Sequence, residues 1–152
     1  MSEQSPQVPP ADWRPEGPSG PRASFGRRFV ALLVDGILLG IVYGLLLSVF
    51  SRETAYALDL LAGIGYYTLL EGGPTGQTLG KKALGIRVVD FDGGGSIGYG
   101  RGLIRYLGRI LSAIPCGLGY FWMLWDNEKQ TWHDKLATSV VVPESYYPVS
   151  PA

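Results

Sequence analysis

Three glycine-rich stretches resemble motifs that bind phosphate, dinucleotides or calcium, and each lacks a residue that the chemistry requires. A phosphate-binding loop in the stretch 72–83 would need a glycine at Thr75 and a hydroxyl group at Lys82. The GxGxxG pattern at 93–98 has no acidic residue about twenty positions later to bind a ribose. A calcium-like loop ends in Arg101, where calcium requires a bidentate carboxylate. The sequence therefore predicts none of these sites.

Residues that carry nucleophilic, acid–base or metal chemistry are scarce. Cys116 is the only cysteine and His133 the only histidine, which excludes disulfide frameworks and most zinc ligand sets. Cys116 lies in an apolar stretch without a basic neighbour, which predicts packing rather than reactivity. No Ser-His-Asp or paired-carboxylate arrangement stands out. We expect no enzyme, no bound metal and no cofactor.

Ionisable residues within apolar runs are a stronger signal. Residues 29–50 contain a single charge, Asp35, and about 20 apolar residues suffice for a helix to span a bilayer. A charge inside a span costs about 2.5–3.5 kcal/mol on insertion scales, so Asp35 is a candidate functional residue. Arg28 lies seven residues before Asp35, which places the two within about 20° of the same helix face. We expect Arg28, or Arg105 or Arg109 from a later segment, to neutralise Asp35.

Three apolar segments must position these charges: residues 28–50, 55–72 and 101–125. The 152-residue chain is 46% hydrophobic and 17% charged, and with these segments it is typical of an integral membrane protein. Glu71 ends the second segment beside a basic loop, where we expect it to be paired. Asp59 lies near the other end of that segment, where we expect its carboxylate to reach water.

A stripe of glycines marks one face of the first segment. Gly36, Gly40 and Gly44 recur every four residues, a spacing that allows a second helix backbone to approach closely. The stripe is compatible with packing inside the chain or with packing between molecules. We favour the chain's own second helix over another copy of the chain or a partner membrane protein.

The third segment begins with a basic helix face formed by Arg101, Arg105 and Arg109. Its 25 residues allow either one crossing or a bend near Pro115 that returns the chain to the same side. In the returning form the segment would lie along the membrane interface. We then expect the three guanidinium groups to reach lipid phosphates.

Two runs outside the apolar segments, GIRVVDF and TSVVVP, have the composition of strands. Pairing would satisfy their backbone groups and build a small cytoplasmic β element from residues 85–92 and 138–143. Such pairing requires both ends of the third segment to lie on one side of the membrane. The sequence therefore links strand pairing to a returning third segment.

The two ends of the chain differ from the middle in composition. Residues 1–23 are rich in proline and poor in aliphatic residues, and we expect them and residues 144–152 to be disordered. Residues 24–143 then form the membrane domain. Basic residues before the first span and after the second predict a cytoplasmic N-terminus. Thirteen basic and thirteen acidic side chains cancel, which argues against nucleic acid as a partner.

Four segments together resemble the RDD family of small membrane proteins: residues 27–35, 66–71 (YYTLLE), 76–90 (GQTLGKKALGIRVVD) and 130–138 (QTWHDKLAT). That family is named for an arginine at the start of its first helix, an aspartate within that helix and a further aspartate. Arg28, Asp35 and Asp134 match these positions, although Ala137-Thr138-Ser139 replaces the Ala-Gly-Thr that the family commonly shows. The resemblance implies a membrane protein, with ligand or ion transport suggested for some members.

We therefore expect an all-α membrane fold of three hydrophobic helical segments with a small cytoplasmic β element, in a multi-pass protein of the cytoplasmic membrane. At the inner leaflet we expect a charged cluster with a transport or structural role: Arg28, Asp35, Glu71, Arg105, Arg109 and Asp134. One hypothesis is a component of ion or small-ligand transport with Asp35 as carrier. The other is an accessory protein that packs on a partner through its glycine stripe. Since three short helices rarely enclose a path, transport would require a homo-oligomer or a partner membrane protein within the lipid bilayer.

Overall fold

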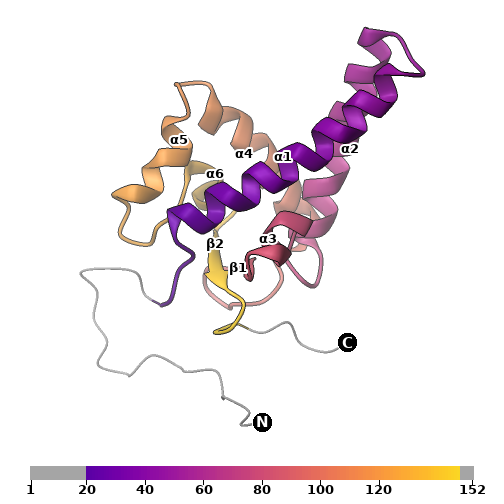
Figure 1. The fold of residues 1–152 in the computed structure, drawn as a ribbon. Helices are drawn as coiled ribbons and strands as arrows, with labels where there is room; N and C mark the ends of the chain where they lie inside the picture. The colour runs from indigo at the N-terminus through magenta and orange to yellow at the C-terminus, as the bar shows by residue number, and fades with distance from the viewer. Residues whose placement is uncertain (1–19, 148–152) are drawn as a thin grey trace, which may run out of the picture.

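A computed structural model describes residues 20–147 and shows a bundle of helices with one strand pair at its base (Figure 1). The elements follow in the order α1 (Phe25–Leu47), α2 (Arg52–Gly72), α3 (Leu79–Ala83), β1 (Ile86–Asp90), α4 (Gly98–Ala113), α5 (Leu118–Phe121), the 3-10 helix η1 (Trp122–Leu124), α6 (Trp132–Leu136) and β2 (Ser139–Pro143).

Helices α1 and α2 form a long hairpin that projects beyond the other elements (Figure 1). Each begins at a serine whose side chain accepts a hydrogen bond from the first turn: Ser24 from the backbone N–H of Arg27, and Ser51 from that of Thr54. Only the four residues 48–51 separate the two helices, so they run side by side in opposite directions. This hairpin matches the first two predicted segments.

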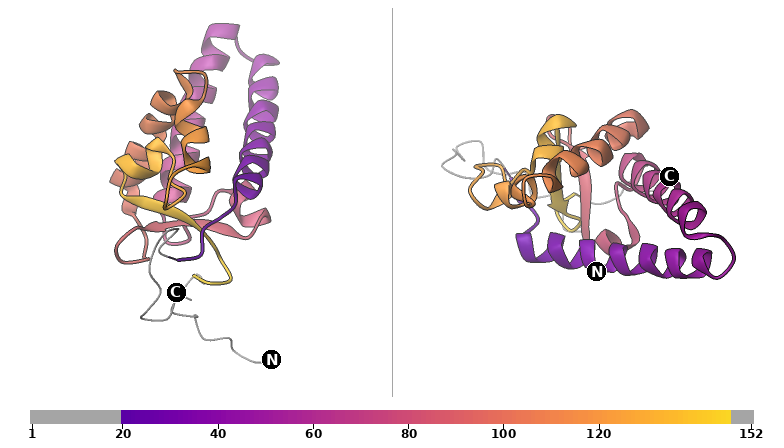
Figure 2. Two further views of the ribbon diagram at one scale, coloured as in Figure 1. Left: turned by 90° about the vertical axis from the view of Figure 1, so that its left-hand side faces the viewer. Right: turned by 90° about the horizontal axis from the view of Figure 1, so that it is seen from above.

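The two strands pair antiparallel, as the sequence predicts. Ile86 lies opposite Pro143 and Asp90 opposite Ser139, and both strands are almost fully buried. Val88 and Val141 pack in one small hydrophobic core with Ala31 of α1. The pairing brings the chain that enters α4 next to the chain that leaves α6, at the base of the bundle (Figure 2).

The third segment is broken near Pro115. Helix α4 and the following α5–η1 pair meet at an angle of 109°, and Cys116 and Gly117 at the break both have positive φ. The strand pair returns the chain to its starting side. The structure therefore has the bend and the strand pairing that the returning form requires.

The prediction of three hydrophobic helices is confirmed only in part. Among the described residues, α1 is the one straight helix that is long and apolar enough to span a membrane. The α4 and α5–η1 pair meets the same criterion only when the bent pair is counted together. Helix α2 forms over the predicted residues but is less apolar, because polar residues such as Asp59 and Glu71 interrupt it.

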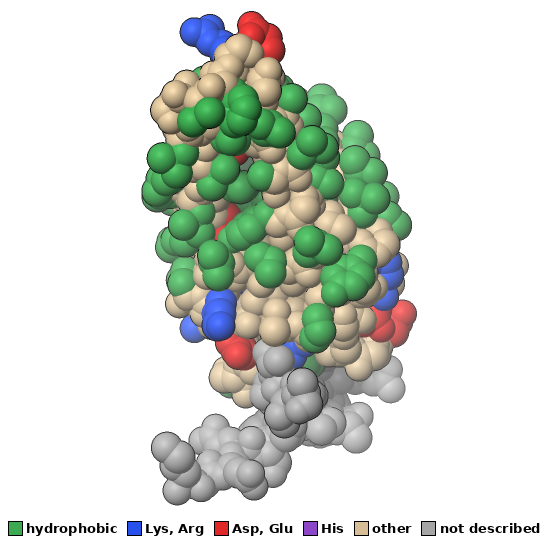
Figure 3. All heavy atoms as spheres, turned by 90° about the vertical axis from the view of Figure 1, so that its right-hand side faces the viewer, with side chains coloured by type: hydrophobic (Ala, Val, Ile, Leu, Met, Phe, Trp, Pro, Cys, Tyr) green, Lys and Arg blue, Asp and Glu red, His purple; other side chains and the backbone are tan. Residues whose placement is uncertain are grey.

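Many large hydrophobic side chains are exposed and several charged side chains are buried, which is the opposite of the distribution in a water-soluble protein. The exposed face of α4 carries leucines and isoleucines, among them Leu107 and Ile110, whereas Arg105, Arg109 and Ser112 on its other face are buried. Hydrophobic side chains also cover most of the α1–α2 hairpin (Figure 3). A lipid environment makes this arrangement favourable, since it solvates the apolar face and leaves the polar groups to pair internally.

Close helix crossings depend on glycines other than the predicted stripe. A Cβ atom at Gly102 would lie 2.7 Å from the carbonyl oxygen of Thr68, and one at Gly108 would lie 2.9 Å from the Cβ of His133. No atom of another element lies within 4 Å of a Cβ built at Gly36, Gly40 or Gly44. The expectation that this stripe packs against the chain's own second helix is therefore wrong, because α1 turns a different face to α2.

Parts of both predicted tails fall within the described residues. The backbone N–H of Ala23 donates to the carbonyl oxygen of Val141, and Ala23 is buried in the core beside β1. Tyr147 packs against the cluster of Val89, Val140 and Val142 on the other side of the strand pair. Residues 1–19 and 148–152 of the predicted tails lie outside the described residues.

The crossing of α2 and α4 can be tested with a single methyl group. We expect Gly102→Ala to lower the free energy of unfolding by about 1–3 kcal/mol, because the methyl group would overlap the backbone of α2. Thermal unfolding of the purified protein in detergent measures this change. Gly100→Ala in the same helix is the matched control, since nothing lies within 4 Å of its Cβ position. Equal melting temperatures for the two variants would contradict the crossing.

Candidate functional site: a buried charge network

Glu71, in the last turn of α2, is the first of two carboxylates in a buried network. Its oxygens accept from Lys81 Nζ at 2.6 Å, from Arg105 Nε at 3.0 Å and from Arg109 Nη2 at 2.5 Å. The carboxylate is fully shielded from solvent. Three elements, α2, α3 and α4, therefore meet at one negative charge, which confirms in geometry the expected pairing of Glu71 with basic residues.

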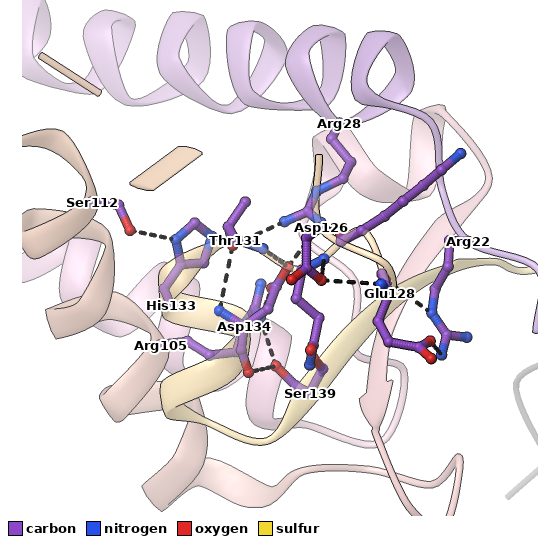
Figure 4. A network of polar contacts seen from close by, with 12 residues as sticks. Arg22, Arg28, Arg105, Ser112, Asp126, Glu128, Thr131, His133, Asp134 and Ser139 are labelled. Atoms are coloured by element: carbon purple, nitrogen blue, oxygen red, sulfur yellow. Dashed lines mark hydrogen bonds and ion pairs between the residues drawn. The ribbon is translucent and has the colours of Figure 1, made fainter. Parts of the chain in front are cut away.

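Asp134 of α6 is the second carboxylate (Figure 4). It forms an ion pair with Arg28 Nη1 at 2.8 Å and another with Arg105 Nη1. Its side chain also accepts from the backbone N–H of Thr131 at 2.9 Å, which completes a capping box at the start of α6. Although burial favours the neutral acid, Arg28 and Arg105 hold the pKa of Asp134 well below its usual range.

Arg105 bridges the two carboxylates and is 0% exposed. Its Nη1 also donates to Ser139 Oγ at 2.7 Å, at the first residue of β2. The expectation that Arg105 and Arg109 extend from an interfacial helix to lipid phosphates at its surface is wrong, because the charged face of α4 turns inward to Glu71 and Asp134. Arg101, one turn earlier, instead pairs with Asp90 at the end of β1 at 2.7 Å.

Asp35 lies outside the ion-pair network. It accepts from the hydroxyl groups of Tyr66 at 2.6 Å and Thr78 at 2.7 Å, and from the backbone N–H of Gly80 at 2.9 Å. The expectation that Arg28, Arg105 or Arg109 neutralises Asp35 is therefore wrong. Neutral donors from α2 and α3 surround this carboxylate.

Helix α3 connects the two parts of the site. Thr78 and Gly80 bind Asp35, and the next residue, Lys81, binds Glu71. Burial lowers the pKa of Lys81 to about 8, against the opposing effect of Glu71. Sequence reasoning missed Tyr66, Thr78 and Lys81 as site residues. Of the three, only Thr78 has a local signal in the sequence, because threonine commonly precedes the first turn of a helix.

His133, next to Asp134, is held in its neutral form. Burial lowers its pKa well below the usual value of 6.5. Its Nδ1 lies 3.1 Å from Ser112 Oγ on α4, and its ring lies 5.0 Å from that of Tyr120. Within residues 20–147 no group of three or more potential metal ligands comes together. The histidine therefore acts here as a packing and hydrogen-bonding residue between α4 and α6.

A cavity of about 210 Å³ borders the network. Its lining includes the cations Arg28, Lys81 and Arg109 and the aromatic residues Phe25, Phe29 and Phe121. The site thus combines a polar part made of ion-paired cations with an aromatic wall.

Comparisons with known proteins find similarity over much of this chain. A model described as the RDD family matches residues 22–138. The proline-rich antigen homolog of Mycobacterium tuberculosis is 39% identical over 71 residues, which cover 47% of this chain and 30% of that protein. The proline-rich antigen of Mycobacterium leprae is 35% identical over 71 residues, 47% of this chain and 28% of that protein.

A relative of similar length is the uncharacterized protein YxaI of Bacillus subtilis, which is 28% identical over 147 residues, 79% of this chain and 96% of that protein. The matched region of this chain spans less than a third of the two mycobacterial antigens. No solved structure is significantly similar to the chain.

Arg105 provides a test of the network. We expect Arg105→Gln to lower the free energy of unfolding by about 3–5 kcal/mol, because Glu71 and Asp134 would lose a shared buried partner. Arg101→Gln, one turn away in a half-exposed pair, is the control and should cost about 1 kcal/mol or less. Chemical denaturation in detergent measures both values. Similar losses for the two variants would show that the buried network does not stabilise the fold.

His133 provides a test by pH. A histidine whose folded pKa is depressed binds fewer protons in the folded protein than in the unfolded one. Its contribution to stability is therefore full above about pH 6.5 and is lost as the pH falls below that value. We expect the melting temperature of the wild type to fall from pH 7 to about pH 5. His133→Gln should show a flatter profile, and parallel profiles would contradict the assignment.

Proposed function

Because this chain belongs to the RDD family, we propose that it is a multi-pass protein of the cytoplasmic membrane that acts as a non-enzymatic accessory protein rather than as a carrier. The observation that supports this role is the environment of Asp35. A carrier carboxylate must release and rebind its ion, whereas both oxygens of Asp35 accept hydrogen bonds and the side chain is completely buried. Asp35 then serves to fix α3 against α1.

Transport is a second candidate, since a buried carboxylate within a membrane helix is a feature that ion carriers use. In that role Asp35 would take up a proton or cation as Tyr66 and Thr78 rotate away. The mostly exposed α1 would require other subunits to complete a path. Both roles use the same membrane arrangement.

In this arrangement the N-terminal end of α1, the α2–α4 connection and the strand pair face the cytoplasm. Three observations support it: the strand pair and the start of α1 lie at the same end of the bundle (Figure 2), basic residues flank these elements in the sequence, and α4 and α5–η1 meet at 109°. The turn at residues 48–51 would face outward. Helix α1 would be one full span.

A partner would contact the exposed face of α1. This face carries Gly36, Gly40 and Gly44 with nothing from the rest of the described chain near their Cβ positions, beside exposed Ile37 and Ile41. Small residues flanked by branched apolar ones suit close helix packing in lipid. We propose that a second copy or another membrane protein occupies this face.

Cysteine labelling in intact cells tests the membrane arrangement. In a Cys116→Ala background we expect Glu53→Cys to react with a membrane-impermeant maleimide, and Asp92→Cys and Ser145→Cys to react only after permeabilisation. All three positions are exposed. External labelling of Ser145→Cys alone would mean that the third segment crosses the membrane. External labelling of both Asp92→Cys and Ser145→Cys would show that the orientation is the reverse of the proposed one.

Asp35→Asn separates the two functions. We expect this variant to lower the free energy of unfolding by about 1.5–3 kcal/mol, because hydrogen bonds to a charged acceptor are lost. Vesicles that contain only the purified wild type should show no proton, sodium or potassium flux above that of empty vesicles. Asp59→Asn is the control, since one oxygen of Asp59 lacks a partner in the described chain. A wild-type flux that disappears in a folded Asp35→Asn variant would overturn the accessory role.

A further inference from the structure

The buried network contains more positive than negative charge. Four cations, Arg28, Lys81, Arg105 and Arg109, face only two carboxylates, Glu71 and Asp134. The difference is 4 − 2 = 2 positive charges, and one remains even when the separately bound Asp35 is included. Neutral His133 adds none. Uncompensated charge is costly in a low-dielectric environment, so this site favours a bound anion.

Hydrogen-bond donors are also left over. Arg109 Nε is buried and has no acceptor within the described chain. The Arg109 side chain stacks over the ring of Tyr67 at 4.1 Å, and it uses Nη2 for Glu71. Within the described chain the ammonium group of Lys81, which carries three donors, has Glu71 as its one acceptor. Both residues line the 210 Å³ cavity.

Stacked aromatic side chains also line this cavity. The ring of Phe25 stacks on those of Phe29 and Phe121, with centroids 6.0 Å and 5.7 Å apart. Phe29 and Phe121 are 48% and 45% exposed, so the aromatic wall continues onto the apolar outer surface of the bundle. A ligand here would contact cations at one end and hydrocarbon at the other.

We propose that this cavity binds an anionic membrane lipid, with its phosphate at Lys81, Arg28 and Arg109 and an acyl chain along Phe25, Phe29 and Phe121. Its lining residues Phe25, Arg28 and Phe29 place the cavity at the N-terminal end of α1. Figure 1 shows that this end of α1 lies near the strand pair, which is the depth of the lipid phosphates in the proposed membrane arrangement. A free phosphate would leave the aromatic wall unused. A bound lipid is compatible with both the accessory and the transport role.

Native mass spectrometry of the purified full chain tests this site with two lipids of identical acyl chains, phosphatidylglycerol and phosphatidylcholine. We expect the wild type to bind phosphatidylglycerol about tenfold more tightly. Lys81→Gln should reduce that preference about fivefold, and Lys81→Arg should retain it. Leu32→Trp fills the cavity without changing charge, and it should weaken binding of phosphatidylglycerol.

Two controls alter the same helix outside the cavity: Arg27→Gln removes an exposed positive charge, and Leu33→Trp enlarges an exposed side chain. Neither should change lipid binding. Equal affinity for the two lipids, or unchanged binding in a folded Leu32→Trp variant, would overturn the proposal. So would inorganic phosphate that raises the melting temperature as much as phosphatidylglycerol, because the ligand would then be a free anion. None of these outcomes depends on whether the vesicles show ion flux.

Discussion

Arg105 is the residue on which the arrangement of the other elements depends. A guanidinium group without solvent contact requires negative partners, and it has two, Glu71 from α2 and Asp134 from α6, with Ser139 of β2 as a further acceptor. Because each partner comes from a different element, satisfying this one charge fixes α2, α4, α6 and β2 relative to one another. Short helices such as α6 would have little stability without that constraint.

The network also explains how a small protein in lipid can have a specific core. Few large apolar side chains are buried, since the hydrophobic surface is turned outward to the membrane. Close approach at glycines such as Gly102 and Gly108 supplies dispersion contacts. The buried ion pairs fix how the helices are oriented relative to one another. Hydrogen bonds to Asp35 perform the same task between α1 and α3 without a counter-ion.

The sequence predicts the elements well and their mutual orientation poorly. The apolar runs indicate α1 and α2, strand composition indicates the β1–β2 pair, and Pro115 indicates the break after α4. The spacing of Arg105 and Arg109 shows that they share a helix face, but an amphipathic pattern is the same whether its polar face meets water or the protein interior. Only the positions of Glu71 and Asp134 in space decide between these cases.

The partners of Asp35 could not be predicted for a different reason. Two are hydroxyl groups and one is a backbone N–H, and none of these carries a charge or spacing that would link it to a carboxylate in another helix. Gly80 contributes through its backbone alone. Pairs of opposite charge are the easiest partners to recognise in a sequence. The sequence therefore predicts an arginine partner for Asp35, whereas the structure has neutral donors there.

The position of Asp134 after Glu71 and Arg105 in the sequence has a consequence for biosynthesis. The ribosome completes α1, α2 and α4 before α6 and β2, so Arg105 enters the membrane region when Glu71 is its only available carboxylate. The nascent chain therefore lacks the second carboxylate partner of Arg105 until α6 emerges and docks. Chains that stop before α6 would present an arginine that lacks one of its two carboxylate partners to the cell's membrane-protein quality control.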